Sequence, residues 1–253
     1  MKMTEGWSVI KIKNFILDLL FPIECFGCGK EDIWLCKQCH KKIAFNIDQS
    51  CLKCGDANNF GEFCKNCKKD SFLDGVLVAS FYKDEITKNL IKSLKYYFAK
   101  DIAKILGEFI NLFLRNQLNK AWLIKQSKDI PQFFKDFNDA LLIPVPLHPR
   151  RERWRGFNQS LKLAQEVIKH YQFELCDNKL KRIIHKKAQA KLQNSQREEN
   201  INGCFEWQGQ NLEGRNVIII DDVVTTGSTL QEIARVLKEN GSGEVWGLAV
   251  AKG

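Results

Sequence analysis

Features that would mark a membrane or exported protein are missing from this sequence. No apolar run reaches the roughly 20 residues that a transmembrane helix needs. The first segment, Met1 to Leu20, is apolar overall, but Lys11, Lys13 and Asp18 interrupt it, so it does not match a secretory signal. We therefore expect no membrane span and a reducing, cytoplasmic compartment.

Two common nucleotide-binding motifs are also missing. Gly209 and Gly214 have the spacing of a Walker loop, but Arg215-Asn216 follow in place of Lys-Ser/Thr, and the glycines precede a predicted strand. The run Gly241-Ser-Gly243 lacks the third glycine of the dinucleotide fingerprint and also precedes a strand. The sequence thus excludes both of these phosphate-binding motifs.

The length and net charge of the chain limit the number of domains and the kinds of partner. The 253 residues suit one medium domain and a small module. Lysine and arginine total 39 against 30 acidic residues, a net charge of +9. Such an excess favours polyanionic partners, namely nucleic acid, nucleotides or a membrane surface, but does not choose among them.

The chain has ten cysteines, and eight form four Cys-x-x-Cys pairs. Pairs of this kind bring four thiolates to the tetrahedral spacing that Zn²⁺ prefers. Grouping in chain order predicts two structural zinc sites, although an interleaved grouping is also open. The first site would use Cys25, Cys28, Cys36 and Cys39, and the second would use Cys51, Cys54, Cys64 and Cys67.

The cysteine segment, residues 22–71, has too few large apolar residues for its own core, so metal binding would supply its folding free energy. Within it, Cys36 to His40 matches the c-type haem attachment motif. We do not expect haem, because that motif lies inside a regular array of cysteine pairs. The segment is also rich in lysine, so a nucleic-acid or protein docking role is as open as a structural one.

Residues 1–21 contain a predicted amphipathic helix, Trp7 to Leu20, with Val9, Ile12 and Ile16 near one face. Packing on the body of the protein, docking to a membrane surface and docking to a partner are all open for it. The predicted organisation is therefore an N-terminal helix in 1–21, a zinc module in 22–71 and an α/β domain in 72–253.

The stretch from Val217 to Leu230 carries the clearest chemistry. A β-branched run ends in Asp221 and Asp222, a hydroxyl-rich loop follows, and helical spacing begins at Leu230. Backbone N–H groups of Thr225 to Thr229 would converge at a helix N-terminus, which is a ready anion site. The two acids would accept hydrogen bonds from sugar hydroxyls or help to hold hydrated Mg²⁺. This combination indicates a ribose 5-phosphate site.

Further strands and helices alternate along the α/β domain, which predicts a mainly parallel sheet flanked by helices. Strands are expected at residues 72–82, 140–146 and 243–251, and helices at 86–98, 101–119 and 161–171. Residues 120–139 are polar and irregular by pattern, so we expect an insert without regular structure. Four arginines crowd the expected loop from Leu147 to Ser160, and arginine clusters suit multidentate phosphate binding.

The acid pair followed by Thr225-Thr-Gly-Ser-Thr229 resembles the signature of type I phosphoribosyltransferases, which binds 5-phosphoribosyl 1-pyrophosphate (PRPP). The resemblance implies that Asp221 and Asp222 face the ribose hydroxyls as the catalytic acids and that PRPP binds with Mg²⁺. The 5-phosphate would be held by Thr225, Thr226, Gly227, Ser228 and Thr229.

Three further segments resemble the competence-associated ComF family of phosphoribosyltransferase-like proteins. They are Leu17-Asp-Leu-Leu-Phe-Pro22, the run Pro144-Val-Pro-Leu-His-Pro149 with Arg151, and Arg155-Gly-Phe-Asn-Gln159. With the zinc module, the resemblance covers nearly the whole chain. It implies that residues 147–158 contact pyrophosphate, chiefly through Arg150, Arg155 and Asn158.

The family's hood segment matches in part over residues 181–205. Gln189, Leu192, Arg197, Asn200, Gly203 and Phe205 fall at the expected places. Lys186 stands where the family usually has threonine, which departs from the pattern by which this hood closes.

Three readings of function follow. The first is a PRPP-binding phosphoribosyltransferase-like protein linked to DNA uptake in natural transformation, with turnover and acceptor left open. The second is a protein that handles single-stranded DNA beside a competence helicase, with a regulatory, non-catalytic PRPP site. The third is a zinc-stabilised scaffold with a decayed site. The intact acids and the Thr-Thr-Gly run argue against the third.

Overall fold

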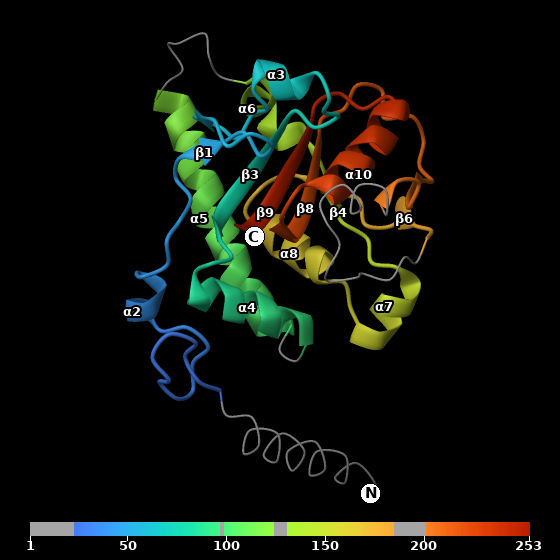
Figure 1. Cartoon of the computed structure of the whole chain (residues 1–253). Coiled ribbons are helices and arrows are strands. Elements are labelled where there is room, and N and C mark those ends of the chain that lie inside the picture. The colour runs from blue at the N-terminus through green and yellow to red at the C-terminus, as the bar shows by residue number, and fades with distance from the viewer. Residues whose placement is uncertain (1–22, 97–98, 124–130, 185–200) are drawn as a thin grey trace, which may run out of the picture. The chain divides into compact units, whose positions relative to one another are not determined.

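The computed structural model describes residues 23–96, 99–123, 131–184 and 201–253 (Figure 1). The chain divides into two compact units, one ending at Ile43 and the other beginning at Ala44. This division places the second cysteine group in the larger unit, whereas the sequence suggested a limit near residue 71. The domain limits of the sequence analysis stay a prediction, and the expected helix in 1–21 lies outside the described residues.

The larger unit is built on a five-stranded sheet in the order β3-β9-β8-β4-β5. Its strands are β3 (Gly75–Phe81), β4 (Leu141–Pro144), β5 (Glu174–Leu175), β8 (Val217–Val224) and β9 (Val245–Lys252). All neighbours pair in parallel, and Ile218 lies opposite both Leu142 and Trp246. The strands are runs of valine, isoleucine and leucine because both faces of a parallel sheet are covered. The predicted fold class is confirmed.

Helices cover both faces of this sheet (Figure 1). On one face lie α5 (Ala99–Leu123) and α8 (Gln159–Val167), with α4 (Glu85–Tyr96) packed against α5. The other face packs against α10 (Ser228–Glu239) and the hairpin of β6 (Leu180–Arg182) and β7 (Phe205–Trp207). Alternating strand residues such as Val217 and Ile219 join Leu230 and Ile233 of α10 in the core. The sheet thereby fixes the start of α10.

The prediction that residues 120–139 form an irregular insert is wrong for the described part of that range. Helix α5 continues to Leu123, α6 spans Gln132–Lys135, and a 3₁₀ turn spans Phe137–Asp139. Phe133 is fully buried and stacks on Trp246 of β9, with ring centroids 4.7 Å apart. Aromatic burial, which has no periodic signal over so short a run, orders this segment.

The arginine-rich segment is helical rather than a continuous loop. Helix α7 (Pro149–Arg155) begins after His148, whose Nδ1 accepts a hydrogen bond from Arg150 N at 3.2 Å. Pro149 fits the first turn because it needs no N–H partner there. Gly156 ends the helix with a φ of 82°, a left-handed conformation that favours glycine.

The first cysteine group lies in the smaller unit and includes the short helix α2 (Lys37–His40). The second lies in the larger unit with β1 (Gln49–Ser50), β2 (Ala57–Asn58) and α3 (Lys65–Lys68). Among the residues that the structure describes, no helix is long and apolar enough to cross a membrane.

The segment that carries the second group runs along the outer edge of β3. Asn46 N donates to Ala79 O at 2.9 Å, and Val76 N donates to Gly61 O at 2.8 Å. Between them the Gln49 amide bonds both backbone groups of Val78, at 3.0 and 3.2 Å. The edge of the sheet is thereby covered, which satisfies backbone groups that would otherwise be unpaired.

Candidate functional site

The predicted phosphate loop joins β8 to α10. Gly227 is the N-cap residue of α10 with a φ of 81°, and Gln231 N donates to its carbonyl at 2.8 Å. The Thr226 and Ser228 hydroxyls bond each other at 2.7 Å. The first turn of α10 carries no acidic residue. The start of this twelve-residue helix therefore has the features of a phosphate site, and the binding of a phosphate there stays a prediction.

The two acids lie in the second half of β8, before Val223 and Val224, and contact different partners, as neighbouring residues on a strand do. Asp221 Oδ1 accepts a hydrogen bond from Ser160 Oγ at 2.8 Å, at the start of α8. Asp222 is 4% exposed, and its Oδ2 lies 2.7 Å from Nζ of Lys95 on α4. Asp221 is thus the acid joined to the arginine-bearing side, and Asp222 is held by a lysine.

The acid pair carries less negative charge than two free carboxylates would. Desolvation and the neighbouring Asp222 carboxylate raise the pKa of Asp221 to about 8. Burial works against the charge of Lys95, but the attraction of Asp222 outweighs it and raises the lysine pKa. Near neutral pH, Asp221 is the group that must lose a proton before it can act as a carboxylate.

The predicted pyrophosphate residues lie on and just after α7. Arg150 and Arg155 belong to α7, and Arg155 Nη1 donates to Gln159 Oε1. Asn158 is buried as the N-cap of α8, where its Oδ1 accepts from Ser160 N at 3.0 Å and its Nδ2 donates to Val145 O at 3.0 Å. Both ends of the Asn158 amide are therefore used within the chain, and this side chain fixes the turn between α7 and α8.

Ser160 connects the two halves of the site. It is fully buried, its N–H is held by Asn158 and its hydroxyl by Asp221. The end of β8 and the turn after α7 are thus tied through one side chain. Of the predicted hood residues, Gln189, Leu192, Arg197 and Asn200 lie outside the described residues. Gly203 N donates to Glu232 Oε1 of α10 at 2.7 Å, and Phe205 is buried on β7.

The eight paired cysteines form two groups in chain order, as the sequential grouping predicted. The groups are Cys25, Cys28, Cys36 and Cys39, and Cys51, Cys54, Cys64 and Cys67, with the sulfurs of each group within 4.8 Å of one another. The Cys28 and Cys36 sulfurs lie 3.8 Å apart, and those of Cys54 and Cys64 lie 3.7 Å apart. A tetrahedron with Zn–S bonds of about 2.3 Å has edges of about 3.8 Å. Both groups fit structural zinc sites.

The chemistry of these sulfurs also suits a metal. All ten cysteines of the chain have free thiols. Burial raises the pKa of Cys51, but backbone N–H groups of Cys54, Cys64 and Lys53 outweigh it and lower the pKa to about 7. Because the thiolate is the form that binds metal, Cys51 is the readiest ligand of its group near neutral pH, whereas Cys54 and Cys67 have raised pKa values and would lose their protons to the metal.

Two residues of the site were not found from the sequence. Lys95 borders the apolar stripe of α4 that contains Leu90, Ile91 and Leu94, so its pattern is that of an ordinary solvated lysine. Ser160 gave no signal beyond its place after Asn158. Only the folded sheet brings both residues to the acids at the end of β8.

Two family models match different parts of the chain. Residues 16–68 match a model described as the double zinc ribbon domain, and residues 158–251 match the phosphoribosyl transferase domain. Among solved structures, a hypoxanthine phosphoribosyltransferase from Staphylococcus aureus aligns at 17% identity over 48% of this chain and 57% of its own, with a TM-score of 0.29. We base no argument on a likeness so weak.

Curated relatives match over longer spans. Competence protein ComFC of Bacillus subtilis is 26% identical over 84% of this chain and 81% of its own length. DNA utilization protein YhgH of Escherichia coli K12 is 37% identical over 42% of this chain and 47% of its own length. Competence protein F of Haemophilus influenzae is 30% identical over 91% of this chain and 98% of its own length. The chain therefore belongs to the competence protein F family, and it combines a double zinc ribbon with a phosphoribosyltransferase domain.

Proposed function

We propose that this protein binds PRPP together with Mg²⁺ at the carboxyl end of β8. The 5-phosphate lies on the loop of Thr225 to Thr229, the ribose faces Asp221 and Asp222, and the pyrophosphate lies toward Arg150 and Arg155. One observation carries the proposal. Ser160 ties Asp221 of β8 to the turn that follows the arginine-bearing helix α7, and the loop after β8 leads to a helix N-terminus free of acidic residues.

The chemistry open to such a site is transfer of the phosphoribosyl group. An acceptor nucleophile would form a bond to the anomeric carbon, and the bond from that carbon to the pyrophosphate oxygen would break. The arginines of α7 would stabilise the charge on the leaving pyrophosphate, and the loop and acids would orient the sugar. Mg²⁺ would supply charge neutralisation on the pyrophosphate when bound. We leave the acceptor unassigned.

The relatives supply the biological setting for this proposal. Two of them are competence proteins by name and several are DNA utilization proteins. We propose a role connected with DNA uptake, on the cytoplasmic side, beside the helicase that handles incoming strands. A reducing compartment suits eight cysteines that serve as metal ligands rather than as disulfides.

Calorimetric titration of the purified protein with PRPP and Mg²⁺ tests the proposal, with ribose 5-phosphate as a second ligand. We expect Mg²⁺-dependent binding of PRPP. The double variant Asp221→Ala/Asp222→Ala should weaken it by at least about tenfold, because ribose and metal contacts are lost. Its zinc content should not change. Equal affinity in the variant would refute the assignment of the acids to the ribose.

A second function is favoured by the surface of α7. Trp154 is 73% exposed and lies between Arg153 and Arg155. An exposed aromatic ring among cations is a platform on which single-stranded bases stack while the backbone is neutralised. The net charge of +9 is in keeping with such a partner. In this alternative, PRPP binding regulates the handling of single-stranded DNA without turnover.

Fluorescence anisotropy tests this alternative by measuring the affinity of the protein for single-stranded DNA of mixed sequence at several salt concentrations. Trp154→Ala should lower the affinity about tenfold, since stacking contributes roughly 1–3 kcal/mol per base. Trp122→Ala is the matched control, because Trp122 is 69% exposed at the end of α5. No binding even at low salt would end the alternative.

A further inference from the structure

The second cysteine group is joined to α10 at three levels along that helix. The first is at the N-terminus of α10, where the phosphate loop lies. Leu52 stands between the ligands Cys51 and Cys54, and a Cβ placed on Gly227 would lie 2.7 Å from its Cδ2. The tip of this Cys-x-x-Cys turn therefore sits directly against the glycine that caps the helix.

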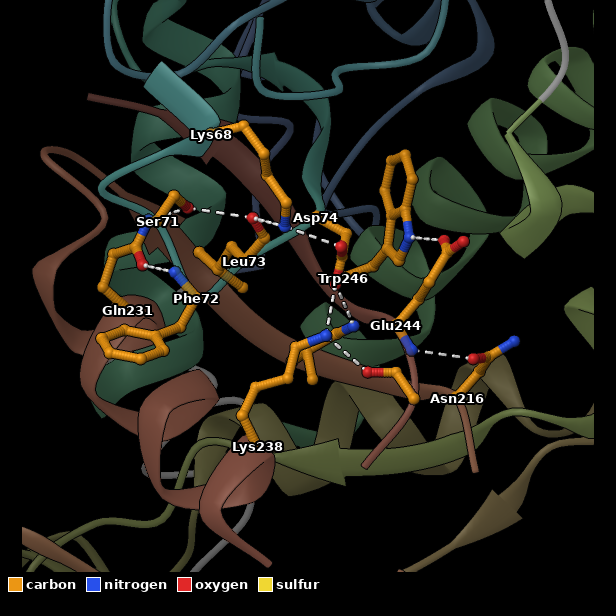
Figure 2. Close-up of polar contacts among 12 residues, drawn as sticks. Lys68, Ser71, Phe72, Leu73, Asp74, Asn216, Gln231, Lys238, Glu244 and Trp246 are labelled. Atoms are coloured by element: carbon orange, nitrogen blue, oxygen red, sulfur yellow. Dashed lines mark hydrogen bonds and ion pairs between the residues drawn. The ribbon is translucent and has the colours of Figure 1, made fainter. Parts of the chain in front are cut away.

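The second level is the middle of α10. The chain leaving Cys67 passes Ser71 and Phe72, and both bond to the Gln231 amide (Figure 2). Phe72 N donates to Gln231 Oε1 at 3.0 Å, and Gln231 Nε2 donates to Ser71 Oγ at 2.7 Å. One side chain of the helix thus uses both of its amide ends on the cysteine segment.

The third level is the last turn of α10, where Asp74 is the centre of a cluster of contacts (Figure 2). Asp74 accepts from Lys68 Nζ at 2.7 Å and from Lys238 Nζ at 3.0 Å. It also accepts from Val245 N at 2.7 Å, at the start of β9. Lys68 directly follows the ligand Cys67, so α10 and the second group share one carboxylate.

Three of the four cysteines of the second group also belong to the main core or pack against it. Cys51 is fully buried within the cluster that contains Leu230 and Ile233 of α10, and Cys64 and Cys67 pack against that cluster. Within the turn itself, the backbone bonds are Cys51 N to Asp56 O at 2.8 Å and Gly55 N to Cys51 O at 2.9 Å. Leu52 itself packs against the same core, and a metal that joins the four sulfurs would hold its turn in that place.

We propose that the second Cys₄ centre positions the phosphate loop. Metal held by Cys51, Cys54, Cys64 and Cys67 fixes Leu52 against Gly227, and this contact sets the affinity of the loop for the 5-phosphate. Leu52 acts as a positioning residue and does not touch the ligand. This inference rests on the proposed function, because it assumes that the loop binds the phosphate of PRPP.

The first cysteine group offers a matched control. Its turn Cys25-Phe-Gly-Cys28 corresponds to Cys51-Leu-Lys-Cys54, so Phe26 occupies the place of Leu52. Phe26 stacks on Trp34 within the smaller unit, with centroids 5.6 Å apart. Phe26→Ala therefore removes a side chain from the same position of the other turn.

The experiment compares Leu52→Ala, Leu52→Met and Phe26→Ala with the natural chain, all loaded with zinc. Affinities are measured for ribose 5-phosphate, which uses the loop, and for pyrophosphate with Mg²⁺, which uses the arginine side. Leu52→Ala should weaken the binding of ribose 5-phosphate by roughly tenfold, because a misplaced binding group costs about that factor in affinity or more. Its affinity for pyrophosphate should not change. Leu52→Met should restore most of the loss, and Phe26→Ala should show none.

Amide hydrogen exchange over residues 225–231 gives a readout that needs no ligand. Leu52→Ala, and more strongly Cys54→Ser, should speed exchange in this segment. Failure of the natural chain to bind PRPP with Mg²⁺ would overturn the proposed function, and exchange would still decide the coupling. Unchanged exchange and unchanged ribose 5-phosphate affinity in zinc-loaded Leu52→Ala would overturn the inference.

Discussion

Lys95 and Asp222 form an ion pair between α4 and β8, with the carboxylate 4% exposed. A buried carboxylate that loses its partner remains desolvated, so removal of the lysine is costly. The pair therefore holds α4 to the end of the strand on which the acid signature lies. The sequence alone shows the acid but not the lysine that satisfies it.

Lys95→Met should lower the free energy of unfolding by about 2 kcal/mol near neutral pH, a value reduced because Lys95 is itself partly exposed. Lys92→Met is the control, since Lys92 lies on the exposed face of the same helix. Denaturant unfolding of both variants measures the difference. Equal losses would show that the ion pair contributes nothing specific.

The raised pKa of Asp221 makes PRPP binding depend on pH. The carboxyl has a pKa of about 8 in the folded protein, so it is protonated below that pH. Binding that requires the carboxylate releases this proton, and affinity should rise with pH until about 8 and then level off. The same shift affects stability. The free energy of unfolding should fall as pH rises from the ordinary aspartate pKa to about 8, because the folded state binds the proton more tightly than the unfolded state.

Calorimetry of PRPP binding in two buffers with different ionisation enthalpies, at about pH 7, measures the proton release. The natural chain should release nearly one proton from Asp221 per PRPP bound. Asp221→Asn removes the titrating group and should abolish this component. An identical release in both proteins would show that the proton comes from elsewhere.

At the scale of elements, the short aromatic helix α6 packs against Trp246 of β9. Phe133 is fully buried, stacks on Trp246 and makes edge contacts with Phe134 and Phe137. Phe133→Ala should lower the free energy of unfolding by about 3–5 kcal/mol, since a large cavity would remain next to β9. Trp122→Ala, on an exposed ring, should cost less than about 0.5 kcal/mol. Similar values for both would contradict this role for α6.

The sequence predicted the elements whose residues repeat with a clear period or motif. The β-branched run before Asp221, the hydroxyl-rich segment and the apolar stripe after Leu230 predicted a strand, a loop and a helix, and the structure has β8, a short loop and α10 there. That the loop binds phosphate stays a prediction. The chain-order grouping of cysteines was also confirmed. In each case neighbouring residues alone determine the local structure.

The rest depends on contacts between residues far apart in the chain. The three phenylalanines of residues 133–137 lie among polar residues, so they gave no helical period. Trp246 nevertheless packs against Phe133 and Phe134, and Phe137 packs against Tyr171 and Phe173. Arginine crowding obscured the helical character of α7, which Pro149 starts and Gly156 ends. The contact between Leu52 and Gly227 has no local signal, because the two residues are 175 positions apart in the chain and only the fold brings them together.

At the scale of the whole molecule, the tandem cysteine groups have different structural settings. The first belongs to the unit that ends at Ile43, and the second is built onto the edge of β3 in the larger unit. Two sequence repeats of one kind thus serve different parts of the protein. Each still fits one metal ion by the geometry of its sulfurs.

Metal analysis of the purified chain should therefore find two zinc ions per molecule, one for each group of four cysteines. Cys28→Ser and Cys54→Ser should each lower this to about one, because three thiolates hold the metal more weakly. Cys176→Ser should keep both ions, since Cys176 lies outside the pairs. A single zinc in the natural chain would contradict two independent sites.

The position of β9 has a consequence for synthesis. This strand lies between β3 and β8, although the ribosome makes it after both. Until Val245 to Lys252 emerges, β3 and β8 have no common neighbour, and Trp246 cannot cover Phe133. During this period the nascent larger unit has the facing edges of β3 and β8 unpaired, and unpaired apolar strands of this kind are prone to aggregation.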